Sequence, residues 1–480
     1  MMSKEIVAFT PQPVWQWFSD ICAIPHPTFH EQALRDFIIK KAEEKGLSVK
    51  RDEIGNILIQ KNGTAGMENR ARVAIQAHID MVAQKTVEST HQFETDPIQL
   101  RIVDGWLFAT DTTLGADNGI GAAMALAIVF SEDIPHPPLD IILTVEEEIG
   151  MGGARALSPE WLTAPYLINL DSEDEGALFI GCAGGRDATF SLPFITSMTQ
   201  GNAYRVQVSG LRGGHSGIDI HTGRANANLV LARVLDVLYH HQPFQLADIK
   251  GGTLRNVITR EAYADIICQG ELPDTLIQTL EATLKAELGD IEPHLQLSVV
   301  KNNTVTEACS VADTAKMIRL IRTIPNGVLR MSTDFKGIVE TSISMGVVAV
   351  ENQSLTIHCL MRSLLETPKD DISQRLQALA DLAGAMVEVS DDYPGWKPDP
   401  SSPLLAKCQT LFTNFYGKAP TIEVIHAGLE CGILKGHAPK MDMISFGPNI
   451  RSAHSPNECV EIASVDKCWQ VFCQLLKEGF

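Results

Sequence analysis

Three things are absent or scarce in this sequence of 480 residues: paired cysteines, long apolar runs and positive charge. The ten cysteines are scattered and form no CxxC pair, which argues against a zinc site built from thiolates and favours reduced thiols. No apolar run reaches the roughly 18 residues of a membrane helix. The N-terminal stretch has polar and acidic residues where a secretion signal needs an unbroken apolar run. We therefore expect a cytoplasmic protein with no membrane partner.

Positive charge is outnumbered, with 39 lysines and arginines against 59 aspartates and glutamates and a formal net charge of −20. A surface of this sign repels phosphate backbones, so we expect no nucleic-acid partner. Hydrophobic residues make up 45% of the chain and charged residues 20%, which is ordinary globular composition. A chain of this length usually forms two or three domains.

The first part of the chain, residues 1–186, alternates short apolar runs with helical segments. Residues 71–80, 139–148 and 165–171 are apolar runs that end in polar or acidic residues, and residues 119–130 are typical of a buried helix. Continuous apolar runs separated by helices predict an α/β domain whose mostly parallel sheet is covered by helices.

Residues 187–391 have a different pattern, in which half-buried strands alternate with amphipathic helices. Glu351 to Gln353 separate two apolar strands and predict a hairpin turn. The segment 391–403 is rich in Pro, Gly and Asp, and the sequence after it resembles the first part again. We therefore predict a catalytic domain of residues 1–186 and 392–480, interrupted by an inserted α+β domain of residues 187–391 that serves as a lid or dimerisation platform.

Polar residues that suit metal chemistry stand at the ends of the predicted strands. They are His78, Asp80, Asp117, the run Glu146 to Glu148, Asp171 and His454. The C-terminal ends of parallel strands share one edge of a sheet, and ligands bind at that edge. Five separate segments therefore deliver imidazoles and carboxylates to one place.

These side chains suit a divalent zinc, cobalt or manganese ion. Several carboxylates are poorly tolerated together without cations, and two ions share such a set if one carboxylate bridges them. Asp117 is the natural bridge, because its glycine-bounded loop leaves both oxygens accessible. His78 and Asp80 are two residues apart on an extended backbone, so Asp80 can orient the His78 ring.

The motifs AIQAHIDMV, TLGADNGIG, TVEEEIGMGG, NLDSED and SAHSPNE together resemble the M20 family of co-catalytic zinc peptidases. The likeness is greatest to the aminoacyl-histidine dipeptidases of the PepD type, which are related to carnosinases, and it extends over essentially the whole chain. The resemblance implies two Zn²⁺ per subunit, with Co²⁺ or Mn²⁺ as substitutes. One ion would be bound by His78, Asp117 and Asp171, and the other by Asp117, Glu148 and His454.

The resemblance also implies roles around the metals. Glu147 matches the general base, Asp80 the acid that orients His78, and a cis peptide is expected after Asp117. The run of three glutamates leaves the register of the base open. We choose Glu147 and Glu148 because the family's acidic pair directly precedes an x-Gly step, here Ile149-Gly150.

Substrate-binding candidates come from the same resemblance. His215 matches a histidine that reaches the substrate carbonyl, in some members from the partner subunit. Asn256 and Arg362 match positions that hold the peptide's C-terminal carboxylate. Gly428 and Glu430 match a substrate-binding loop in which Glu430 would receive the α-amino group. A solvated glutamate in a glycine-rich turn is the alternative for Glu430.

The function that follows is hydrolysis of short peptides, and the resemblance favours dipeptides with a C-terminal histidine. An aminoacylase acting on N-acyl amino acids, or a tripeptidase, would use the same metal site. A serine hydrolase and a non-catalytic binding protein are the alternatives from other classes. We expect a homodimer formed through the inserted domain, because His215 would then act across subunits.

Overall fold

The computed structural model describes residues 5–302 and 305–480, which divide into two compact units. The first unit comprises Met1–Cys182, Trp396–Val424 and Leu429–Phe480, and the second comprises Ala183–Gly395 and Ile425–Gly428. The second unit is thus inserted into the first. The chain passes between them after Cys182 and after Gly395, and the segment that carries Gly428 packs with the second unit.

The first unit is built on an eight-stranded sheet with the order β1-β2-β6-β3-β7-β23-β8-β22. Its central strands are β6 (Leu139–Thr144), β3 (Val73–His78), β7 (Tyr166–Asn169) and β23 (Asp442–Ser445), and they pair in parallel. The outer strands are β1 (Ser48–Arg51), β2 (Ile57–Lys61), β8 (Ala177–Cys182) and β22 (Thr421–Ile425). Every residue of β3 and β6 is buried, as expected for strands covered on both faces. The predicted α/β fold is confirmed.

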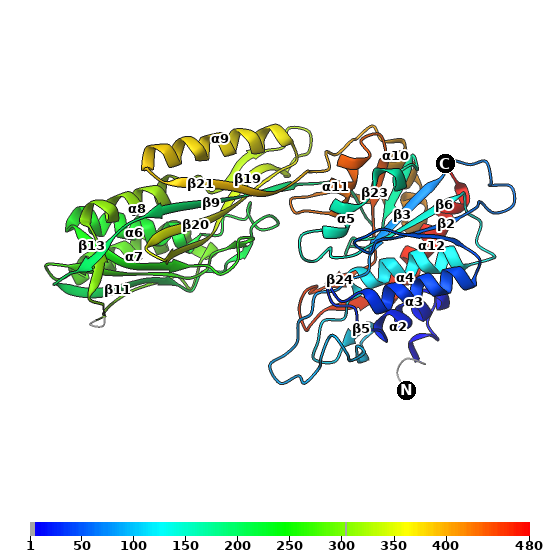
Figure 1. Ribbon diagram of the computed structural model, residues 1–480, viewed down its shortest axis with the longest axis horizontal. Helices are drawn as coiled ribbons and strands as arrows, with labels where there is room; N and C mark the ends of the chain where they lie inside the picture. Colours follow the sequence, from blue (N-terminus) through cyan, green and yellow to red (C-terminus); the bar gives the residue numbers. More distant parts are fainter. Residues whose placement is uncertain (1–4, 303–304) are drawn as a thin grey trace. The chain divides into compact units, whose positions relative to one another are not determined.

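Helices surround this sheet (Figure 1). They are α2 (Gln12–Cys22), α3 (Gln32–Glu44), α4 (Ala116–Phe130), α5 (Gly152–Ala156), α10 (Pro403–Tyr416), α11 (Glu430–His437) and α12 (Ile462–Glu478). Helix α4 packs against β3 and β6, and its many small apolar residues allow it to be buried on almost every side. Within the ranges that the structure describes, no helix has the length and hydropathy needed to cross a membrane.

A smaller antiparallel sheet in the first unit has the order β24-β25-β5-β4. Its strands are β4 (Leu100–Val103), β5 (Trp106–Ala109), β24 (Ile450–Arg451) and β25 (Cys459–Glu461). Strands β24 and β25 flank the loop that carries His454, so this sheet anchors both ends of that loop.

The second unit is built on a nine-stranded antiparallel sheet with the order β16-β11-β15-β13-β19-β20-β9-β21, and β18 pairs with β19 off this path. The strands are β9 (Gly184–Pro193), β11 (Asn202–Ser209), β13 (Phe244–Gly251), β15 (Ala262–Cys268), β16 (Gln296–Lys301), β18 (Gly327–Met331), β19 (Val339–Glu351), β20 (Ser354–Ser363) and β21 (Met386–Tyr393). Two short pairs accompany it, β10 (Thr196–Met198) with β17 (Glu307–Cys309) and β12 (Gly214–His215) with β14 (Val257–Ile258). The predicted hairpin joins β19 to β20 through Asn352 and Gln353, whose φ angles of 49° and 58° are those of a tight turn.

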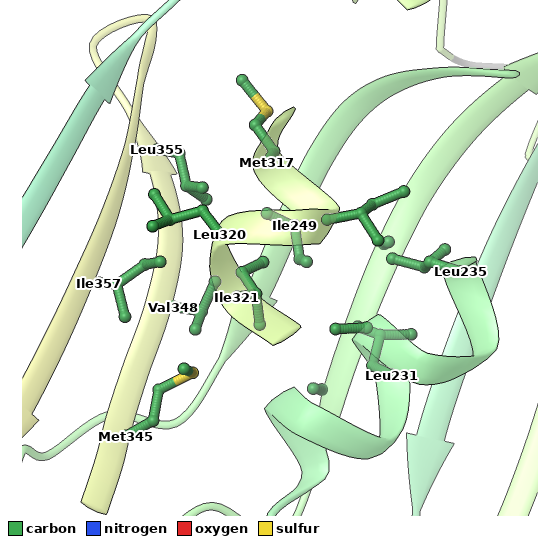
Figure 2. Packing of buried hydrophobic residues seen from close by; sticks show 14 of the residues in the cluster. Leu231, Leu235, Ile249, Met317, Leu320, Ile321, Met345, Val348, Leu355 and Ile357 are labelled. Carbon is green, nitrogen blue, oxygen red and sulfur yellow. The ribbon is translucent and has the colours of Figure 1, made fainter. Parts of the chain in front are cut away.

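Four longer helices complete the second unit. They are α6 (Ala227–His241), α7 (Asp274–Leu288), α8 (Val311–Thr323) and α9 (Glu366–Ala383), and Figure 1 shows α9 running along β21. Figure 2 shows the core, where Leu231 and Leu235 of α6 and Leu320 of α8 lie over apolar residues of the sheet. Ile249 of β13 and Val348 of β19 belong to the same buried cluster. Burial of this apolar surface stabilises the packing of the helices against the nine-stranded sheet.

Candidate metal centre

The candidate metal ligands of the first unit do gather at one edge of the parallel sheet. His78 is the last residue of β3, Asp171 follows the end of β7, and Glu148 follows the end of β6. Asp117 lies in the first turn of α4, where its own φ and ψ of −82° and 107° interrupt the helix. The peptide bond from Asp117 to Asn118 is cis, as the family resemblance implies.

Each of the two imidazoles lies beside a different carboxylate oxygen of Asp117. His78 Nε2 lies 3.2 Å from Asp117 Oδ1 and 3.6 Å from Asp171 Oδ1. His454 Nε2 lies 3.2 Å from Asp117 Oδ2 and 3.0 Å from Glu148 Oε2. Asp117 therefore presents one oxygen to each histidine, and each histidine has a second carboxylate of its own.

These separations fit a shared metal-binding group. Two ligand atoms at tetrahedral positions on a zinc ion are about 3.4 Å apart. One ligand atom each from His78, Asp117 and Glu148 lies within 4.8 Å of the other two. Glu148 Oε1 is buried and has no hydrogen-bond partner among the described residues. A buried carboxylate oxygen without a donor favours a cation beside it.

The pKa shifts of the clustered side chains indicate that the site holds more carboxylate groups than positive charges. Burial raises the pKa of Asp171 to about 7, and the neighbouring Asp117 adds to this shift. Burial also raises the pKa of Glu147 well above its ordinary value, with Glu148 and Asp171 as further causes. Hydrogen bonds to Asp117 and Glu148 raise the pKa of His454 to about 11. The site therefore favours added positive charge, which divalent cations supply.

Asp80 connects several parts of the site through one buried carboxylate. Its Oδ1 lies 3.3 Å from His78 Nδ1 and accepts the backbone N–H of Glu147 at 3.0 Å. Its Oδ2 accepts the backbone N–H of Glu148 at 3.2 Å and the hydroxyl of Thr28 at 2.9 Å. Asp80 thus holds the His78 ring and the backbone of both glutamates in one arrangement.

Glu430 is the first residue of α11 and is fully buried. Its Oε2 accepts hydrogen bonds from Gln76 Nε2 at 2.5 Å and from Thr144 Oγ1 at 2.7 Å. Burial raises the pKa of Glu430 to about 8. The solvated turn considered for this residue is therefore wrong, and Glu430 lies against Gln76 of β3 and Thr144 of β6.

The remaining candidates belong to the second unit. His215 ends β12, which pairs with β14, and Ser216 N donates to Asn256 O at 2.9 Å, so His215 and Asn256 lie on adjacent segments. His215 Nδ1 accepts the backbone N–H groups of Gly217 at 3.1 Å and Ile218 at 3.0 Å. A neutral ring that accepts at Nδ1 carries its proton on Nε2. In this form, Nε2 of His215 is a hydrogen-bond donor.

Arg362 and Gly428 also lie in the second unit. Arg362, in β20, is only 4% exposed and donates from Nη1 to the Tyr393 hydroxyl at 3.0 Å. Its Nε has no hydrogen-bond partner among the described residues. Gly428 is half-buried in the loop that precedes α11. A buried guanidinium with an unused donor is suited to a carboxylate ligand.

Two buried residues are not anticipated by the sequence. His426 lies in the segment that packs with the second unit, and its Nε2 is 2.8 Å from Ser342 Oγ. Glu458 lies four residues after His454 and is 2% exposed. A single histidine in a loop normally indicates a solvated residue, so nothing local points to His426. Glu458 is the last residue of the motif SAHSPNE, but the motif does not predict its burial.

Comparison with known proteins agrees with the fold. Residues 74–478 match the sequence profile of peptidase family M20/M25/M40. The fold and the metal-binding group define a metal-dependent hydrolase, and the chain belongs to this peptidase family.

Individual relatives are similar over their full length. The "Cytosol non-specific dipeptidase" of Escherichia coli K12 is 46% identical, with 99% of each chain covered. The crystal structure of aminoacylhistidine dipeptidase from Vibrio alginolyticus superimposes with a TM-score of 0.89 at 43% identity and covers 100% of this chain and 99% of that one. Human carnosine dipeptidase 1 shares the fold, with a TM-score of 0.52 at 11% identity over 100% and 98% of the two chains.

Proposed function

We propose that this protein is a cytosolic dipeptidase that uses two zinc ions per subunit and prefers dipeptides with a C-terminal histidine. The observation that carries the proposal is the position of Asp117, whose two oxygens each lie 3.2 Å from a different imidazole. The two full-length relatives, one named a cytosol non-specific dipeptidase and the other an aminoacylhistidine dipeptidase, support the substrate class.

The metal ligands divide into two sets that share Asp117. His78 and Asp171 would complete one set, and Glu148 and His454 the other, in keeping with the distances around each imidazole. Bound divalent cations in such a site polarise a scissile carbonyl and lower the pKa of an attacking water. Cobalt and manganese prefer the same nitrogen and oxygen ligands and would substitute.

Proton transfer is assigned to Glu147. Its carboxylate belongs to the buried acidic cluster, and its backbone N–H is held by Asp80. In this role Glu147 takes a proton from the attacking water and then delivers it to the leaving amine. Asp80 serves by orienting His78 and by fixing the backbone of Glu147.

The second unit provides the groups that suit the rest of the substrate. His215 would donate from Nε2 to the carbonyl oxygen, and Arg362 and Asn256 would hold the C-terminal carboxylate. Gly428 would contribute to the substrate loop, and Glu430 would offset the positive charge of the α-amino group. We assign residues 187–391 as the lid and dimerisation domain of a homodimer.

A substrate panel tests the proposal. The purified protein is incubated with Xaa-His dipeptides, other dipeptides, tripeptides and N-acyl amino acids, before and after chelation and return of Zn²⁺. We expect hydrolysis of dipeptides, fastest for Xaa-His, loss of activity on chelation and recovery with metal. Activity confined to N-acyl amino acids would show an aminoacylase, and full activity after verified metal removal would contradict the two-metal site.

A further inference from the structure

The carboxylate of Glu458 binds the N-terminal end of α4. Its Oε2 accepts the backbone N–H of Leu114 at 2.8 Å and of Gly115 at 2.9 Å. Its Oε1 accepts the backbone N–H of Ala116 at 2.7 Å and of Asp117 at 3.2 Å. The first N–H groups of a helix have no partner within the helix, and no side chain of the N-cap residue Gly115 is available to cap them. Glu458 accepts all four hydrogen bonds, from donors that lie 341 to 344 residues earlier in the chain.

The same residue is tied closely to His454. Glu458 N donates to Ser455 O at 3.0 Å, and Ser455 Oγ donates to Ser452 O at 2.8 Å. The backbone at Ser452 and His454 is left-handed, with φ of 55° and 61°, so the loop is sharply turned. A compact turn therefore joins the imidazole that faces Asp117 Oδ2 to the carboxylate that holds Asp117 N.

We infer that Glu458 is a positioning residue for the metal-binding pair Asp117 and His454. It fixes the two loops against each other, so that His454 Nε2 stays 3.2 Å from Asp117 Oδ2. The inference rests on the proposed function, because it assigns Glu458 to the metal that these two residues would share. Groups that orient metal ligands typically change metal affinity about 10–100-fold when removed.

The test is the variant Glu458→Gln. Glutamine has nearly the same shape, but its NH₂ group cannot accept a hydrogen bond and would face N–H donors. We expect the Co²⁺ dissociation constant, measured by absorbance titration of the chelated full-length protein, to rise at least about tenfold for one bound ion. The visible Co²⁺ spectrum of that ion should change as well, because the ligand geometry changes.

Glu292→Gln is the matched control. Glu292 is 1% exposed in the second unit, and its carboxylate accepts the backbone N–H of Arg212 at 2.8 Å and of Ala225 at 2.9 Å. This variant should lose comparable hydrogen bonds and leave Co²⁺ affinity unchanged. If Glu458→Gln does not fold, Glu458→Asp replaces it, since aspartate keeps the charge but is one methylene too short to reach all four N–H groups.

The outcomes separate the hypotheses. Weaker Co²⁺ binding in the Glu458 variant alone supports the inference. A Glu458 variant with the Co²⁺ affinity and the Co²⁺ spectrum of the wild type would overturn the inference. Glu458 would then act only as a helix cap. Equal weakening by Glu292→Gln would overturn it too, because a general loss of stability would then explain both. A wild-type protein that binds no Co²⁺ would instead contradict the proposed function itself.

Discussion

Asp80 accepts the backbone N–H of Glu147 at 3.0 Å, and the same carboxylate oxygen lies 3.3 Å from His78 Nδ1. One buried acid therefore links the residue proposed as general base to a proposed metal ligand. His78 is the last residue of β3 and Glu147 follows the end of β6, so the link joins two neighbouring strands of the same sheet. A change at Asp80 should affect metal binding and catalysis together.

We expect Asp80→Asn to bind metal about 10–100-fold more weakly. Asparagine keeps one acceptor oxygen, so its NH₂ group would face the backbone N–H of Glu147 or Glu148, and His78 would lose its negative partner. Metal content after dialysis and a Co²⁺ titration measure the effect. Asp140→Asn is the control, because Asp140 is also buried, in β6, but pairs with Arg72 at 2.8 Å. Wild-type metal affinity in Asp80→Asn would contradict the role.

Glu147→Gln should retain metal and lose most turnover, by about 10²–10⁴-fold in kcat. The reason is that glutamine cannot take the proton of the attacking water. Steady-state kinetics on a good dipeptide, together with metal analysis, measure this. Glu146→Gln should be near wild type, since Glu146 is given no role in the site. A large loss in Glu146→Gln with normal activity in Glu147→Gln would show that the register of the base is wrong.

Gly217→Ala should lower kcat about tenfold or more while metal content stays normal. A Cβ at Gly217 would lie 2.0 Å from the backbone oxygen of His426. The backbone must therefore move, and with it the N–H group that sets the His215 ring. Gly270→Ala is the control, because its Cβ would meet only the end of the Gln242 side chain. Unchanged kcat in Gly217→Ala would argue against His215 as a positioned donor.

The free energy of unfolding should fall in mild acid, because His426 is buried in its neutral form. Burial, with Arg362 as the next cause, lowers the pKa of His426 from 6.5 to about 3. At intermediate pH the unfolded chain binds a proton here that the folded chain does not, so stability is present above 6.5 and is lost as the pH falls towards 3. The loss from this group is about 2 kcal/mol between roughly pH 7 and pH 5.

The variant His426→Gln should remove that part of the pH dependence. Urea unfolding of the intact chain at several pH values measures it. An identical slope in wild type and His426→Gln would show that His426 is not the titrating group.

Much of the first unit and its metal centre is predictable from local sequence. The runs that become β3 and β6 are mostly apolar because both faces of these strands are buried. Parallel strands end at one edge, so the sequence predicts that His78 and Asp171 lie together. The two residues that separate β19 from β20 likewise predict their hairpin, because the turn is a local structure.

The sequence by itself determined which residue types reach the sheet edge, since strand periodicity and chain direction are local properties. Only the tertiary structure decided how they face each other: that Asp117 turns one oxygen to His78 and the other to His454, that Glu430 is buried against Gln76, and that Glu458 caps the Asp117 loop. The N–H groups at a helix start can donate to any nearby carboxylate, and many glutamates in the chain have the same chemistry. Which carboxylate binds the start of α4 depends on the packing of segments that are far apart in the sequence.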